Sequence, residues 1–202
     1  MSRCSPEFLE RPCWIFDLDG TLTRSVHDFA HMRSELGIKP DQDILGTIAA
    51  KPEPERSRLE QRLDELELHY ARLAAPAEGV LHLLVYLHNR GAQLGILTRN
   101  SRDIALNSLK AIGVDHLFPE DAVLGRDEAR PKPDPEGIVR LLRHWQCEPH
   151  NSVMVGDFRF DLEVGRAAGT ATIHVAADDQ PSWPEFTDLK VRSLAELLDL
   201  ML

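Results

Sequence analysis

Cys13-Trp14-Ile15-Phe16-Asp17-Leu18-Asp19-Gly20-Thr21-Leu22-Thr23 is the segment on which the predicted fold depends. Its first four residues are apolar, and a short apolar run rich in β-branched and aromatic side chains is typical of a buried strand. The run ends at two carboxylates, Asp17 and Asp19, and Gly20 then permits a sharp turn. Carboxylates at the end of a parallel strand face the crevice in which open α/β sheets bind ligands. Taken alone, the pattern also fits a strand that ends in an ordinary Asp-Gly turn.

The rest of the chain alternates short apolar runs with helical patterns. The runs predict strands over residues 93–98, 122–124, 152–157 and 171–175, and the helical patterns cover 80–89, 101–112, 134–147, 160–168 and 194–202. This alternation indicates βαβ units and a parallel sheet. We therefore predict the α/β class, with a Rossmann-like parallel sheet and helices on both faces. Residues 1–12 and 177–189 are expected to be a poorly ordered tail and a polar loop.

Residues 24–75 are predicted to form an all-helical insertion after the first strand. Helical spacing covers 24–39, 41–50 and 56–73, and the last segment carries one apolar stripe with charged residues on its other faces. The catalytic core would then comprise residues 1–23 and 76–202, and we call residues 24–75 the cap. His27 and His31 lie four residues apart, as metal ligands can, but no further ligand follows at a useful spacing, so solvated or packing histidines are the simpler interpretation.

Composition restricts the classes of partner. The chain has 202 residues, 43% hydrophobic and 28% charged, with a net charge of −10 and no long basic block, which argues against a nucleic-acid partner. No apolar run has the length of a membrane span or a signal sequence, so we expect no membrane partner and a cytoplasmic location. The three cysteines, Cys4, Cys13 and Cys147, are odd in number and lack C-x-x-C spacing, which argues against a disulfide framework or a zinc site. A monomer or weak dimer is expected.

Polar residues follow several predicted strands at the point where each strand ends. Asp17 and Asp19 follow the first strand, Thr98 ends the second and Asp157 ends the fourth. The carboxyl ends of parallel strands lie at one edge of the sheet, so these side chains should meet in one crevice. Lys132 lies between prolines that hold the chain extended before a helix, and it would bring a positive charge to this crevice.

Asp157 and Asp161 lie four residues apart across a predicted strand-to-helix turn. Two carboxylates in this arrangement can point toward one ion, and an all-oxygen carboxylate site suits Mg²⁺ rather than zinc. Asp161 also fits a second role, because a negative charge in the first turn of a helix is favoured by the helix dipole. Both roles can hold together.

These residues carry a resemblance to a known family, the haloacid dehalogenase-like hydrolases. Residues 17–23 resemble the first family motif, Thr98 the second, Lys132-Pro133 the third, and Gly156-Asp157 with Asp161 the fourth. The resemblance covers nearly the whole chain, with residues 24–75 in the place of the small helical cap of phosphatases similar to phosphoglycolate phosphatases. Many of these carry an acidic residue just after the first motif, where this chain has Thr23-Arg24-Ser25. That departure leaves the substrate open.

The resemblance implies the following roles. Asp17 would be the nucleophile that attacks phosphorus, and Asp19 would protonate the leaving oxygen and then activate water. Mg²⁺ would be bound by the carboxylates of Asp17 and Asp157 and the backbone carbonyl of Asp19, with support from Asp161. Thr98 would hydrogen-bond a phosphoryl oxygen, and Lys132 would stabilise the phosphate charge and Asp17. An opposing charge is physically required, because a carboxylate that attacks a phosphate dianion meets like-charge repulsion.

The predicted function is therefore a Mg²⁺-dependent phosphomonoesterase that hydrolyses a small anionic phosphorylated metabolite through an aspartyl phosphate. Two alternatives stay open: a sugar phosphomutase of the same superfamily and a phospho-accepting signalling domain. A dehalogenase is disfavoured, because family members of that kind lack the acidic residue two positions after the nucleophile. Substrate contacts are expected from Arg99, Asn100, Arg24, His27 and Lys51, with Arg56 and Arg58 as further candidates.

Overall fold

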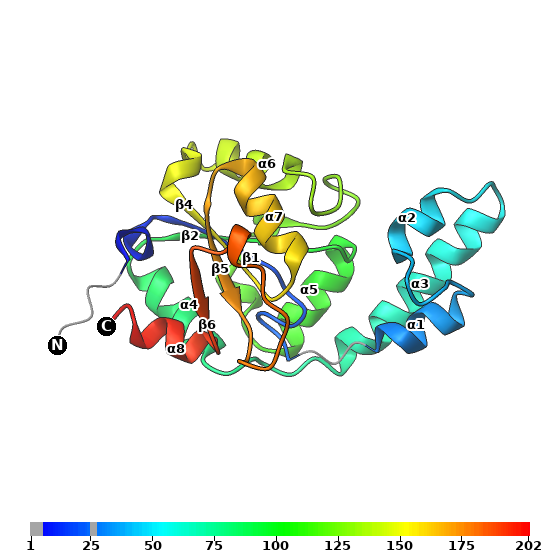
Figure 1. The fold of residues 1–202 in the computed structure, drawn as a ribbon, viewed down its shortest axis with the longest axis horizontal. Helices are drawn as coiled ribbons and strands as arrows, with labels where there is room; N and C mark the ends of the chain where they lie inside the picture. The colour runs from blue at the N-terminus through cyan, green and yellow to red at the C-terminus, as the bar shows by residue number, and fades with distance from the viewer. Residues whose placement is uncertain (1–5, 25–27) are drawn as a thin grey trace.

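The computed structural model describes residues 6–24 and 28–202 and contains a six-stranded sheet. Its strand order is β3-β2-β1-β4-β5-β6, and every neighbouring pair of strands is parallel. The strands are β1 (Cys13–Phe16), β2 (Gln93–Leu97), β3 (Val123–Leu124), β4 (Ser152–Gly156), β5 (Ala171–Val175) and β6 (Leu189–Val191). The predicted α/β class with a Rossmann-like sheet is confirmed (Figure 1).

Helices cover both faces of the sheet. Along β1, Trp14 and Phe16 enter one hydrophobic core while Cys13 and Ile15 enter the other, as the pleat of a strand requires. The first core also takes apolar side chains from α4, α5 and α8, and the second takes them from α6 and α7. These helices are α4 (Val80–Asn89), α5 (Arg102–Ala111), α6 (Glu136–His144), α7 (Arg159–Ala168) and α8 (Leu194–Asp199). Short 3₁₀ helices span Glu7–Glu10, Asp115–Leu117, Glu120–Ala122, Pro149–Asn151 and Pro184–Phe186.

The strand order determines where a ligand site can form. From β1 the chain builds outward to β2 and β3 on one side, and to β4, β5 and β6 on the other. Such a reversal opens a crevice at the carboxyl ends of the central strands, between β1 and β4. The two acidic motifs that the sequence analysis identified follow these two strands directly.

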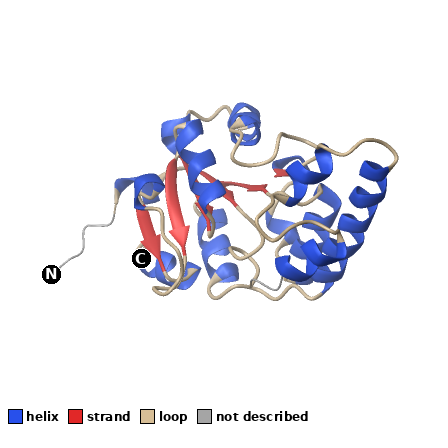
Figure 2. Cartoon of the chain, turned by 45° about the vertical axis from the view of Figure 1, so that its right-hand side comes forward, coloured by secondary structure: helices blue, strands red, loops and turns tan. Residues whose placement is uncertain are grey.

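The three helices of the cap stand beside the sheet and have a core of their own (Figures 1 and 2). They are α1 (Phe29–Glu35), α2 (Ile44–Ala49) and α3 (Glu55–Arg72). The chain leaves and re-enters the core at one place, because the backbone N–H of Arg24 donates to the carbonyl oxygen of Ala75 at 2.8 Å. The described part of α1 and the whole of α2 are shorter than the helices predicted over 24–39 and 41–50. They begin where the side chains of Asp28 and Asp43 accept hydrogen bonds from the first turn.

Three further expectations are corrected. Residues 1–12 are not wholly a loose tail, since Leu9 is 1% exposed and lies in the first core. The segment predicted as a polar loop over 177–189 leads into β6, which is too short to give a strand pattern in the sequence and is held at the edge of the sheet by pairing with β5. The cysteines were expected to be unpaired, but the structure joins Cys13 and Cys147 in a disulfide.

The disulfide has a topological origin. Its cysteines are 134 residues apart in sequence, and they meet because α6, which ends just before Cys147, packs on the sheet face to which Cys13 points. No spacing rule within the sequence shows such a contact. Within the described residues, no helix combines the length and the apolar character needed to cross a membrane.

Candidate active site

Asp17 and Asp19 lie in the turn that follows β1. The backbone N–H of Asp17 donates to the carbonyl oxygen of Val155 in β4 at 2.9 Å, which places the Asp17 side chain between the two central strands. The carbonyl oxygen of Leu18 then accepts from the N–H groups of Thr21, Leu22 and Thr23 and closes the turn. Gly20 has a φ of 87° within it, and a Cβ there would overlap the carboxylate of Asp157. Glycine is therefore required both by the backbone angle and by the close approach of β4's end.

Lys132 is the buried cation of the site. Its Nζ lies 2.5 Å from Oδ1 of Asp17 and 2.6 Å from Oδ1 of Asp161, and its side chain is 3% exposed. A lysine this deeply buried needs charged partners, and the two carboxylates supply them. Lys132 is therefore a buried member of the site, as the sequence predicts, and not a solvated residue of its proline-rich loop.

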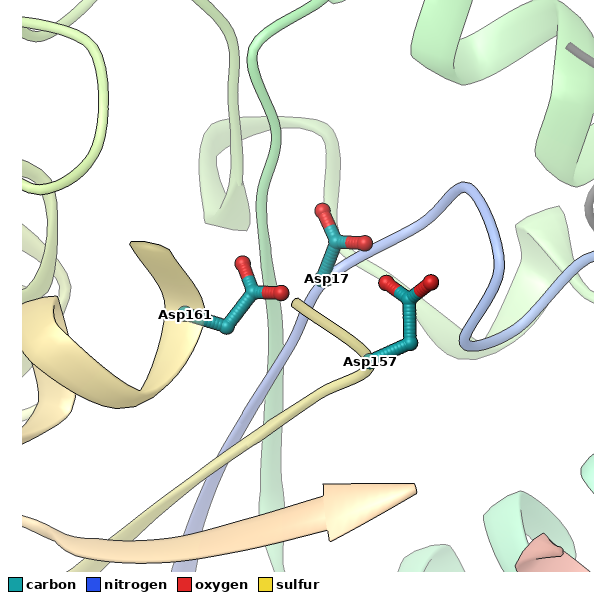
Figure 3. Close-up of side chains that lie close together, drawn as sticks. All are labelled: Asp17, Asp157 and Asp161. Atoms are coloured by element: carbon teal, nitrogen blue, oxygen red, sulfur yellow. The ribbon is translucent and has the colours of Figure 1, made fainter. Parts of the chain in front are cut away.

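Asp157 and Asp161 complete an acidic cluster with Asp17 (Figure 3). One carboxylate oxygen from each of the three residues lies within 4.8 Å of the others. Asp161 also accepts a hydrogen bond from the backbone N–H of Phe158 at 3.0 Å, and so caps α7. Its two oxygens thus bind Lys132 and the helix start, so Asp161 has the predicted role at the start of α7 and fixes the cluster beside Asp17 and Asp157.

The charges of this cluster are unbalanced. Burial raises the pKa of Asp17 to about 7; the charge of Lys132 opposes the rise, and Asp161 and Asp19 add to it. Burial also raises the pKa of Asp157 to about 8, with contributions from Asp17 and Asp161. Burial lowers the pKa of Lys132, but the charges of Asp161 and Asp17 outweigh it and hold that pKa above its ordinary value. Three carboxylates facing one ammonium leave an excess of two negative charges when all are ionised, which a divalent cation would balance.

Thr98 and Asn100 follow β2 and approach the same crevice. The backbone N–H of Thr98 donates to Leu124 at the end of β3, and its hydroxyl accepts from the N–H of Asn100 at 3.2 Å. The side-chain amide of Asn100 donates to Oδ2 of Asp19 at 2.6 Å. Asn100, predicted as a substrate contact, is therefore placed to orient Asp19, while the Thr98 hydroxyl keeps its own proton to donate.

Arg99 connects the core to the cap. Its Nη2 lies 2.6 Å from Oδ1 of Asp43, the residue that caps α2, and its guanidinium stacks over the Phe160 ring at 4.9 Å. Arg126, in the loop after β3, makes a second connection: its Nη1 donates to both carboxylate oxygens of Glu67 in α3, at 3.1 and 2.8 Å. Neither pair was predicted, because partners this far apart in the sequence leave no local pattern in it.

The cap residues predicted to contact substrate do not gather at the site. Lys51 lies 2.7 Å from Glu55 and Arg56 lies 2.6 Å from Glu53, both in exposed pairs within the cap. Arg24 is exposed where the chain leaves the core, and Arg58 is exposed on α3. His27 lies outside the described residues.

A cavity of about 470 Å³ lies between the core and the cap. The core contributes the motif residues and two aromatic side chains from the start of α7, Phe158 and Phe160. Thr98 and the cap residues discussed above, Lys51, Arg24, Arg56 and Arg58, are not among the described residues that line it. The cap contributes Phe29, Arg33, Asp41, Asp43, Ile44 and Glu67, among others. Asp17, Asp19, Lys132, Asp157 and Asp161 therefore line a cavity large enough for a small substrate.

Comparisons with known proteins agree with this site. The family model described as haloacid dehalogenase-like hydrolase matches residues 14–175. The pyrophosphatase PpaX of Bacillus pumilus is 30% identical over 205 residues, which cover 93% of this chain and 94% of that protein. PpaX of Halalkalibacterium halodurans is 29% identical over 206 residues, with 93% and 95% covered.

A solved structure shares the fold. CbbY from Rhodobacter sphaeroides, in complex with phosphate, superposes with a TM-score of 0.75 at 21% identity, covering 95% of this chain and all of that one. The family match spans most of the chain, and the acidic and basic residues of the first, third and fourth motifs surround one crevice. The chain therefore belongs to the haloacid dehalogenase-like hydrolases.

Proposed function

We propose that the protein is a Mg²⁺-dependent phosphatase that hydrolyses phosphomonoesters through an aspartyl phosphate. The observation that carries the proposal is the Lys132 ammonium, buried between Asp17 and Asp161 with Asp157 beside them at the switch point of the sheet. This arrangement holds a carboxylate nucleophile next to positive charge. The names of the relatives support it, since one is called a pyrophosphatase and another was solved with phosphate.

The proposed reaction has two steps. An oxygen of Asp17 attacks phosphorus, the bond from phosphorus to the leaving oxygen breaks, and Asp19 gives its proton to that oxygen. Asp19, now a carboxylate, then takes a proton from water as the water oxygen attacks the same phosphorus and the bond to Asp17 breaks. Asn100 orients Asp19 for both transfers through its 2.6 Å hydrogen bond. Lys132 holds Asp17 in place and offsets the charge of the phosphoryl oxygens.

The donor set fits Mg²⁺. Three carboxylates with a net excess of negative charge are the hard oxygen ligands that this ion prefers. Asp17 and Asp157 would bind it, with the backbone carbonyl of Asp19, and Asp161 would support them. When bound, the ion would neutralise charge on the nucleophile and the phosphate.

The cap is proposed to be a separate unit, residues 24–75, that closes the cavity over a small phosphorylated substrate. The small volume of the cavity argues against nucleic acids as substrates. A cytoplasmic location and a monomer or weak dimer remain proposals.

Phosphate release from p-nitrophenyl phosphate, with and without Mg²⁺, tests the proposal. We expect release that needs the ion and is lost in Asp17→Asn. Asp178→Asn, an exposed carboxylate in the loop after β5, is the matched control and should retain activity. A sugar phosphomutase would instead convert a sugar phosphate to its isomer without releasing phosphate, so product analysis separates the two.

A further inference from the structure

A group of three aromatic rings, one exposed and two partly buried, lies beside the motif residues. The ring of Phe158 is 50% exposed, although Phe158 directly follows Asp157 in the chain. It packs edge-to-face against Phe160, with centroids 5.2 Å apart, and against Trp183 at 5.4 Å. None of these three rings belongs to any of the three hydrophobic cores formed by the described residues. We call Phe158, Phe160 and Trp183 the aromatic cluster.

The cluster is fixed relative to the reacting atoms. Phe158 is the N-cap residue of α7, and its N–H donates to the same Asp161 carboxylate that binds Lys132. Behind it, Trp183 contacts the ring of His174 at 5.3 Å, and Nε2 of His174 lies 3.1 Å from the backbone oxygen of Asp157. The elements that position the acidic cluster therefore also position the rings.

The rings face the space that a leaving group would occupy. Phe158 and Phe160 line the same cavity as Asp17 and Lys132. A phosphoryl group placed against Asp17 sends its leaving group into the remainder of this cavity. Across it, the cap presents further apolar side chains, with Ile44 of α2 and the half-exposed Phe29 of α1 among them. An apolar wall at this place is what a planar ring binds best.

The charges that line the cavity disfavour an anionic leaving group. Among the described lining residues, the cationic side chains are Lys132, Arg99 and Arg33. Lys132 and Arg99 are already paired with carboxylates, and Arg33 donates to the backbone carbonyl oxygens of Gln42 and Phe29, at 3.1 and 3.2 Å. The cap side adds the carboxylates of Asp41, Asp43 and Glu67. Asp43 pairs with Arg99 and Glu67 pairs with Arg126, so none of these described cations is left without a partner to receive a second negative charge, whereas a neutral ring needs none.

We propose that the substrates are phosphomonoesters whose leaving group is neutral and carries a planar aromatic ring, with a nucleoside 5′-monophosphate as the representative case. The inference rests on the proposed phosphatase function and adds to it the class of substrate. The ring packs on Phe158 and Phe160, and Arg99, stacked on Phe160, extends the same surface. Stacking of this kind does not depend on which base the nucleotide carries, because every base has a π-face.

The test compares two substrates with the same reacting end. Uridine 5′-monophosphate and ribose 5-phosphate release phosphate from the same kind of primary oxygen, so the ratio of their kcat/KM values isolates the base. We expect the ratio to be about tenfold or more in the wild type, and to fall toward one in Phe158→Ala and Phe160→Ala. Leu81→Ala, which removes a 47% exposed apolar side chain on α4 away from the cavity, should keep the wild-type ratio.

A ratio near or below one in the wild type would overturn the proposal, as would a high ratio that survives both phenylalanine variants. Preference for 2-phosphoglycolate or pyrophosphate, lost in Arg33→Gln, would also overturn it and indicate an anionic leaving group. If no ester is hydrolysed, the phosphatase proposal fails. Calorimetry of nucleotide binding then tests separately whether the cavity binds an aromatic ring. Tighter binding of the nucleotide than of ribose 5-phosphate would support the aromatic site, and equal binding would refute it.

Discussion

Replacing Arg126 by methionine should destabilise the protein through one buried carboxylate. Arg126 Nη1 donates to both oxygens of Glu67 and to the backbone oxygen of Arg99, and its Nη2 pairs with Asp64. The side chains of Arg126 and Glu67 are 14% and 6% exposed, so this pair is largely removed from water. Methionine keeps much of the aliphatic length but leaves Glu67 without its cation.

The magnitude follows from this burial. Removing one partner of a buried ion pair typically costs about 3–5 kcal/mol, and the small residual exposure of Arg126 places the expected loss near the lower end, about 3 kcal/mol. For a chain of this size the loss corresponds to a fall in Tm of about 6–12 °C. Asp64 adds little, because its side chain is 56% exposed.

The loss should depend on pH. Burial raises the pKa of Glu67 to about 7 even beside Arg126, so the folded state favours the protonated carboxyl. The contribution of the protonated Glu67 to stability is fully present below the pKa that Glu67 has in the unfolded chain. That contribution is lost as the pH rises through the folded-state pKa of about 7. Without Arg126 the charged form is disfavoured further. The destabilisation by Arg126→Met should therefore be larger at about pH 8 than at about pH 5.5, where Glu67 is protonated.

Urea denaturation at both pH values measures the effect. Arg62→Met, the same substitution at an exposed pair with Glu35 and Glu65, is the matched control and should change stability far less. The double variant Glu67→Gln/Arg126→Met should recover much of the loss at the higher pH, because no unpaired charge remains. Equal effects of Arg126→Met and Arg62→Met, or no recovery in the double variant, would refute the reasoning.

The other predictions concern catalysis. Asp17→Asn should abolish phosphate release while circular dichroism shows an intact fold, because an amide keeps the shape but is not a nucleophile; wild-type turnover would exclude Asp17 from that role. Chelation by EDTA should remove activity and Asp157→Ala should raise the Mg²⁺ concentration required, so full activity after chelation would contradict the metal assignment. Burial raises the pKa values of Asp17 and Asp157 to about 7 and about 8, so protons compete with the ion, and calorimetry should find Mg²⁺ binding weaker at about pH 6 than at about pH 8; an affinity independent of pH would count against this. Replacing residues 24–75 by a short linker should change the ranking of substrates in a metabolite panel, and an unchanged ranking in a folded protein would show that the cap does not set specificity.

The sheet and the motif residues could be predicted because both depend on local patterns. Apolar runs that end in Asp17 or Asp157 show where strands stop, and parallel topology brings those ends together without further information. Lys132 could be predicted as well, because an acidic crevice needs a cation. Lys132 lies between prolines that hold the chain extended just before a helix, where it can supply that charge.

The residues that join the cap to the core could not be predicted in this way. In the sequence, Asp43 has only the pattern of a residue at a helix start, and Glu67 has the pattern of a solvated charge on a helix. Each nevertheless binds an arginine of the core. Conversely, Lys51 resembled a substrate ligand but pairs with Glu55 one helical turn away. Which charge meets which partner depends on how residues 24–75 pack against the rest of the chain, and no periodicity in the sequence shows that packing.

The covalent role of Asp17 is the central claim, and acid quenching during turnover followed by borohydride reduction tests it most directly. An acyl phosphate on a carboxylate is reduced to an alcohol, so tandem mass spectrometry should find homoserine at position 17 when substrate and Mg²⁺ are both present, and aspartate at 19 and 157. Turnover with aspartate retained at position 17, or with homoserine at another position, would contradict the proposed mechanism.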